Sequence, residues 1–129
     1  GSIPVASLIT ATATPTHVGP AATVAEVRAA GRASGRMRIL MMDGNAVPAI
    51  VHVRDTMMMS DRSPVIDIAR PAHVLTPKMP VYEALTRMRA ASVQLAVVMD
   101  GDRMLGVVSL SDILKRVLPT NIPLVEPTA

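Results

Sequence analysis

The segment 106–112 (GVVSLSD) combines residue types that can hold a phosphorylated ligand. Gly106 has no side chain, so a ligand can approach the backbone there. The hydroxyl groups of Ser109 and Ser111, with free amide groups at the start of a helix, can bind a phosphate group. The carboxylate of Asp112 can accept hydrogen bonds from a ribose diol, as acidic residues do in dinucleotide-binding folds. A simpler interpretation is that Ser111 and Asp112 only cap the helix, and the motif alone leaves both open.

A weaker form of this motif, AIVHVRD, occupies residues 49–55. It keeps the aspartate, as Asp55, but replaces the glycine with alanine and the first serine with His52. An aspartate that recurs at the end of a strand pattern is a candidate ligand contact in each copy. His52, Arg54 and Asp55 therefore form a candidate second site, weaker than the first.

These two motifs belong to a longer internal repeat. Residues 18–57 align without a gap on residues 75–114, and ten of the 40 aligned positions are identical. Two copies of a small unit usually bury a face against each other, and their symmetry creates a cleft between them. The identical pairs are Pro20/Pro77, Val24/Val81, Glu26/Glu83, Arg32/Arg89, Ala33/Ala90, Met42/Met99, Asp43/Asp100, Gly44/Gly101, Val51/Val108 and Asp55/Asp112.

The hydrophobic pattern predicts the order β–α–β–β–α in each copy, an α/β (α+β) fold of two pseudo-symmetric repeats. Residues 4–10 are expected to form a short helix or an irregular lead-in. We predict that the segment 20–23 supplies a turn and a helix N-cap, and that Gly35 ends that helix. We also predict that Pro80 is the first helical residue of its helix, that Asp55 caps a helix ending at Met59, and that Ser111 or Asp112 caps the last helix. The predicted strands are 16–18, 38–42, 47–53, 73–75, 95–99 and 104–110, and the predicted helices are 24–33, 55–59, 81–91 and one from 111 or 112 to about 118.

The expected organisation has five parts. Residues 1–2 resemble a remnant of tag removal, and the two repeats occupy 3–60 and 66–119. A linker at 61–65 joins them, and a Pro-containing tail follows at 120–129.

Composition excludes several classes of function. The chain has 129 residues with 50% hydrophobic residues, one Tyr and no Phe, Trp or Cys. Ten Met residues must therefore help to fill the core, although one of Met57, Met58 and Met59 is expected to face outward. The net charge is only +3, without a basic run or stacking aromatics, which argues against nucleic acid. Neither a zinc-type ligand spacing nor a nucleophile–base arrangement is visible, so the sequence gives no indication of an enzyme.

The tandem β–α–β–β–α order and the motif at 106–112 resemble a pair of CBS domains packed as one Bateman module. Three segments resemble the version in the CorC/cyclin M family of magnesium and cobalt efflux transporters. They are 34–39 (SGRMRI), 50–55 (IVHVRD) and 95–100 (LAVVMD) followed by the motif at 106–112. The resemblance covers about residues 5–118.

This resemblance implies a regulatory site for an adenine nucleotide, ATP or AMP, often together with Mg2+. Matching motifs nominate Arg36, Met37, Arg38, Ile39, Ser109, Ser111 and Asp112 as nucleotide-binding residues. The resemblance also implies a homodimer, attached in a longer protein to a transmembrane transport domain at the cytoplasmic face of the cell membrane.

Two other functions remain open at this stage. Leu40 stands where the family usually has proline. In the weaker motif at 49–55, Ala49 stands at the position that Gly106 occupies in the motif at 106–112. These departures, with the Met-rich segment after Asp55, favour a ligand-free structural dimerisation module. A small metal-sensing or catalytic α/β domain has less support.

Overall fold

A computed structural model describes residues 3–9, 15–44 and 46–118. The predicted remnant at 1–2 and tail at 120–129 lie outside these residues. The helices are α1 (Val24–Ser34), α2 (Val81–Ala90) and α3 (Leu110–Val117), and the short 3-10 helices are η1 (Val5–Leu8), η2 (Val53–Thr56) and η3 (Ile66–Ile68). The strands are β1 (His17–Val18), β2 (Arg38–Met41), β3 (Ala49–His52), β4 (Arg70–Pro71), β5 (His73–Leu75), β6 (Leu95–Asp100) and β7 (Arg103–Ser109).

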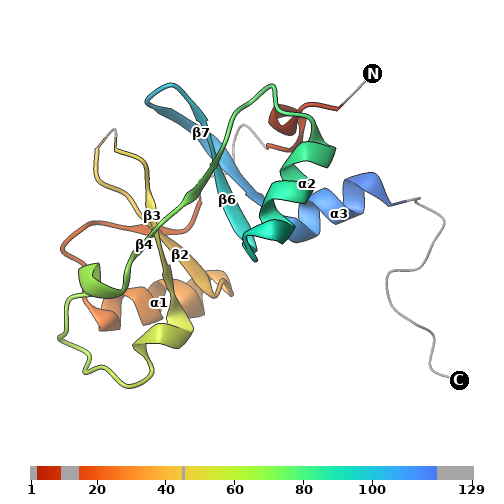
Figure 1. The fold of residues 1–129 in the computed structure, drawn as a ribbon. Coiled ribbons are helices and arrows are strands. Elements are labelled where there is room, and N and C mark those ends of the chain that lie inside the picture. The colour runs from red at the N-terminus through yellow and green to blue at the C-terminus, as the bar shows by residue number, and fades with distance from the viewer. Residues whose placement is uncertain (1–2, 10–14, 45, 119–129) are drawn as a thin grey trace, which may run out of the picture.

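Two sheets, one in each half, confirm the predicted mixed fold. One has the strand order β1-β2-β3-β4 and the other β5-β6-β7. In each half a short first strand pairs in parallel with the next, which pairs antiparallel with the strand after it. A single extended segment, 70–75, supplies β4 to the first sheet and β5 to the second, and Figure 1 shows it crossing between the two halves. The two halves are therefore joined by shared backbone as well as by packing.

The core has three parts, one inside each half and one between them. The part between the sheets contains Leu40, Ala72, Val97 and Met99, all at most 8% exposed. Leu40 and Val97 occupy equivalent positions in the two repeats, so the repeat itself supplies the face along which the halves meet. Met41, Met79, Met88 and Met99 are buried, as expected for a core that lacks aromatic side chains.

The two lead-in segments are exchanged between the halves. The amide of Val5 donates to the carbonyl oxygen of Met79 at 2.8 Å, so residues 4–9 pack on the second half. The amide of Val65 donates to the carbonyl oxygen of Ala22 at 3.1 Å, so the segment after the linker packs on the first half. Met79 and Ala22 are equivalent positions of the repeat, and each lead-in continues as a 3-10 helix, η1 or η3. Each half therefore contains a short segment from outside its own repeat.

Several predicted helix ends were correct and others were wrong. Thr23 begins α1 in a capping box with Glu26, and Gly35 ends it with φ +73°. Pro80 is the N-cap of α2 and lies outside the helix, because its ψ of 142° is extended. Ser109 is the N-cap of α3, so neither Ser111 nor Asp112 holds that position.

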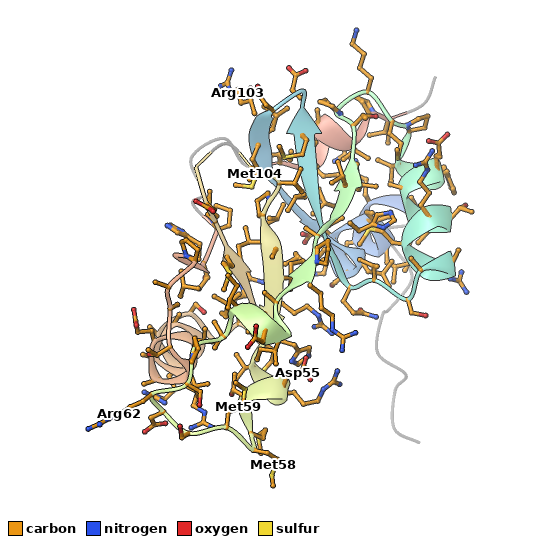
Figure 2. The ribbon with its side chains drawn as sticks, turned by 60° about the vertical axis from the view of Figure 1, so that its left-hand side comes forward. Asp55, Met58, Met59, Arg62, Arg103 and Met104 are labelled. Atoms are coloured by element: carbon orange, nitrogen blue, oxygen red, sulfur yellow. The ribbon has the colours of Figure 1, made fainter. Side chains whose placement is uncertain are left out.

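The predicted helix 55–59 is a 3-10 helix, η2, which ends at Thr56 and has His52 as its N-cap. The carbonyl oxygen of Thr56 accepts from the amide of Met59 at 3.0 Å and from Arg28 Nη2 at 2.6 Å. This carbonyl therefore closes a tight i+3 turn, which replaces the i+4 bond that an α-helix needs. Met57 and Met58 are 71% and 97% exposed, and Figure 2 shows Met58 at one end of the molecule, pointing outward.

Candidate functional site

A cavity of about 340 Å³, here called pocket 1, lies where the two halves meet. Residues from the N-terminal segment, from the start of β2 and from the end of β7 surround it. Its size is within the range of small-ligand sites, about 300–1,000 Å³. The lining residues are Leu8, Ile9, Pro15, Thr16, Arg36, Arg38, Leu40, Leu95, Gly106, Val107, Ser109 and Asp112.

Ser109 and Asp112 reach pocket 1 from the junction of β7 and α3. The amide of Asp112 donates to Ser109 Oγ at 3.0 Å, and the amide of Ser109 donates to Asp112 Oδ2 at 3.3 Å. This reciprocal pair is a capping box, so both side chains begin the helix. They also line the cavity, and a carboxylate has further lone pairs for a ligand. Capping and ligand binding are therefore compatible roles for these two residues.

The other nominated residues lie at the start of β2 or just before it, and only some of them line pocket 1. Successive side chains of an extended strand point to opposite faces. Arg36, Arg38 and Leu40 line pocket 1, whereas Ile39 is 0% exposed in the core of the first half. Met37 is 51% exposed and lines another hollow with Met57, and Arg36 contributes to both cavities. The sequence nominated the continuous run 36–39, and only Arg36 and Arg38 of that run line pocket 1.

Ser111 is exposed and does not belong to the lining of pocket 1. It lies one residue before Asp112 in the first turn of α3, so its side chain leaves the helix in another direction. Of the seven nominated residues, the cavity thus contains Arg36, Arg38, Ser109 and Asp112.

Leu8 and Ile9 are lining residues that sequence reasoning missed. A Cβ atom built on Gly106 would lie 2.7 Å from Ile9 Cγ2, closer than side-chain atoms approach one another. Gly106 therefore leaves room for Ile9, in addition to any access it gives a ligand. The repeat contained no signal for this contact, because residues 4–9 lie before its first aligned position.

A second cavity, pocket 2, has a volume of about 270 Å³ and is related to pocket 1 by the repeat. The three residues of the candidate second site, His52, Arg54 and Asp55, all line it. Its other lining residues are Arg38, Ile50, Arg70, Pro71, His73, Ser92, Val93, Gln94 and Leu95. Arg38 and Leu95 occupy equivalent positions of the two repeats, and both line both cavities.

The environment of His52 lowers the pKa of its imidazole below the ordinary 6.5. Burial is the main cause, because it disfavours the charged ring; the positive charges of Arg38 and Arg54 lower the pKa further, while Asp55 opposes them. The amide of Arg54 donates to His52 Nδ1 at 3.0 Å. In the neutral ring the proton therefore resides on Nε2.

Within the described ranges, no group of three or more His, Cys, Asp or Glu side chains could hold a metal ion. No helix in the same ranges is long and apolar enough to cross a membrane.

The second half of the chain matches a known family: the family model for the CBS domain covers residues 65–119. No curated protein matches the sequence. The structure is similar to that of a putative signal-transduction protein with CBS domains from Burkholderia ambifaria, with a TM-score of 0.79 and 21% identity. That similarity covers 96% of this chain and 100% of the other.

Two further similar structures contain nucleotides. One is the CBS domain of the bacterial CNNM/CorC family Mg2+ transporter in complex with ATP, with a TM-score of 0.79, 20% identity and coverage of 88% of this chain and 86% of that one. The other is a CBS domain protein from Pyrobaculum aerophilum complexed with AMP, with a TM-score of 0.73, 23% identity and coverage of 85% and 89%. At these identities the similarity establishes the fold, which is that of CBS domain structures, with helices and two sheets.

Proposed function

We propose that this chain is a regulatory module that binds an adenine nucleotide, ATP or AMP, in pocket 1. The observation that carries the proposal is that two arginines, a helix N-cap serine and an aspartate from both repeats line one cavity with apolar walls. Similar folds containing ATP and AMP support this choice of ligand.

Each lining group suits one part of the nucleotide. The guanidinium groups of Arg36 and Arg38 attract phosphate through charge-assisted hydrogen bonds. Asp112 is placed to accept hydrogen bonds from ribose hydroxyls, and Ser109 Oγ lies beside it at the start of α3. Leu8, Ile9 and Val107 provide an apolar surface for the base. Mg2+, where present, would be bound mainly through the nucleotide phosphates.

A module of this kind acts by binding, without a catalytic step of its own. We propose that it belongs to a CorC/cyclin M type divalent-cation transporter, on the cytoplasmic side of its membrane domain, and that two modules form a homodimer. A nucleotide can shift the arrangement of such a dimer only by its difference in affinity for the two arrangements.

A ligand-free dimerisation module is the second candidate function. It is favoured by the exposed apolar side chains of Met37, Met57 and Met58, of which the first two line one hollow of the first half. This function predicts that no nucleotide changes the melting temperature of the protein, whereas the first proposal predicts a rise with adenine nucleotides.

Thermal unfolding with ATP, ADP, AMP and GTP, each with and without Mg2+, separates the two proposals. A ligand at 100 times its Kd adds about 2.7 kcal/mol to the free energy of unfolding. In a domain of this size that corresponds to a rise in Tm of roughly 10 °C. A rise restricted to adenine ligands supports the sensor, and no rise with any ligand supports the dimerisation module.

The Asp112→Ala variant locates the binding site, and Glu26→Ala is its matched control. Both residues are the N3 members of a capping box, so the two changes should affect helix stability to a similar extent. Only Asp112 lines pocket 1. The nucleotide-dependent rise in Tm should disappear in Asp112→Ala and persist in Glu26→Ala. An unchanged rise in both variants would place the site elsewhere.

A further inference from the structure

Pocket 2 has a different chemical character from pocket 1. Three arginines and two histidines line it, opposed by the single carboxylate of Asp55. Part of that negative charge faces Arg54, whose Nε lies 3.9 Å from Asp55 Oδ1. These nitrogen-bearing residues are Arg38, Arg54, Arg70, His52 and His73.

Within the described part of the chain, both histidines keep a ring nitrogen without a hydrogen-bond partner. His52 accepts the Arg54 amide at Nδ1, which leaves the Nε2–H of the neutral ring free to donate. His73 Nε2 is buried, and among the described residues it has no hydrogen-bond partner. A buried polar atom without a partner destabilises the folded state, and a polar ligand that reaches it can offset that cost.

We propose that pocket 2 binds a compact polyanion of the diphosphate class, and that this binding weakens nucleotide binding in pocket 1 through Arg38. The cluster of donors and the volume of about 270 Å³ suit a small, highly charged group. The coupling part of this proposal rests on the proposed function of pocket 1.

The sign of the coupling follows from charge. Arg38 lines both cavities, so one guanidinium serves the anions in both. An anion that binds second meets an arginine that the first has already neutralised, together with the negative charge of the first. Coupling between two sites is reciprocal, so each ligand weakens the other by the same factor.

The three histidine rings provide a direct test with inorganic pyrophosphate. His52 and His73 line pocket 2, whereas His17 lies on β1 and lines neither cavity. Pyrophosphate should shift the ring NMR signals of His52 and His73 and leave that of His17 unchanged. The shifts should be lost in Arg70→Gln, because Arg70 is exposed and lines only pocket 2. Absence of these shifts in the unaltered chain would overturn the proposed site.

Calorimetric titration with ATP then tests the coupling. Saturating pyrophosphate should raise the Kd for ATP by about five-fold or more in the unaltered chain, within the usual range of coupling between sites. The increase should vanish in Arg70→Gln, whose ATP affinity without pyrophosphate is unchanged. An equal increase in Arg70→Gln would show direct competition in pocket 1 and overturn the coupling. If ATP does not bind at all, the coupling fails with the proposed function, while the histidine shifts still decide whether pocket 2 takes a polyanion.

Discussion

Val5 and Val65 occupy equivalent places in the two halves, although each packs on one half and lies in the sequence just before the other. Both side chains are 0% exposed, and each amide pairs with the carbonyl oxygen of an equivalent residue, Met79 or Ala22. The sequence separation of these valines differs from that of the aligned repeat, so the relationship appears only in three dimensions.

Val5→Ala and Val65→Ala should destabilise the protein to a similar extent, by about 2 kcal/mol each, because each removes fully buried methyl groups. The midpoint of chemical unfolding measures this loss. Val47→Ala is the matched control, since Val47 is 50% exposed and its change should cost less than about 0.5 kcal/mol. A Val5→Ala variant as stable as the control would show that the N-terminal segment does not contribute to the second half.

Gly106→Ala should lower stability by about 1–3 kcal/mol, because the new methyl group overlaps Ile9. Displacing Ile9 also changes the wall of pocket 1, so nucleotide affinity should fall as well. Ile9→Ala in the same chain removes the overlap, and the double variant should lose less than the sum of the two single changes. Additive losses in this double-mutant cycle would show that the two residues do not interact.

Arg28 should contribute more to stability than its ion pair with Asp61 suggests. Its Nη1 lies 2.8 Å from Asp61 Oδ1, but Asp61 is 71% exposed, and an exposed pair contributes at most about 1 kcal/mol. Nη2 also donates to the Thr56 carbonyl, and Thr56 is only 1% exposed. Arg28→Ala leaves that oxygen without this donor and should cost about 1–3 kcal/mol, whereas Asp61→Asn should cost less. Equal losses in the two variants would contradict this assignment.

The free energy of unfolding should decrease as the pH falls below about 6.5, with His52 contributing to the decrease. Its pKa is lowered in the folded protein, so in that range the unfolded chain binds more protons, which favours unfolding. His52→Asn keeps an acceptor for the Arg54 amide but does not titrate. Unfolding curves at pH 7.5 and 5.5 should show a smaller difference in this variant than in the unaltered chain.

The positive charges around His52 lead to a related prediction about its pKa. Arg38→Gln and Arg54→Gln should each raise the pKa of His52, and Asp55→Asn should lower it further. A titration of the ring signals by NMR measures all three changes, with His17 as the internal reference. A pKa unaffected by the arginine substitutions would leave burial as the only cause of the shift.

The internal repeat and the hydrophobic periodicity were enough to predict the mixed fold of two similar halves. These features are local, because a strand or an amphipathic helix displays its period within about ten residues. The same is true of the two ends of α1 at Thr23 and Gly35, whose cap geometries depend on near neighbours. The aspartates of the duplicated motif, which the sequence marks as candidate ligand contacts, line the two cavities, and their binding role stays a prediction.

The sequence by itself determined the elements of each half and the residue types available for a site, since both follow from short-range pattern and composition. Only the tertiary structure decided which of those residues meet. Alternation along β2 placed Arg38 at pocket 1 and Ile39 in the core, and the exchange of lead-in segments placed Ile9 against Gly106. A contact between distant segments depends on how whole faces pack, and the spacing of residues along the chain does not contain that information.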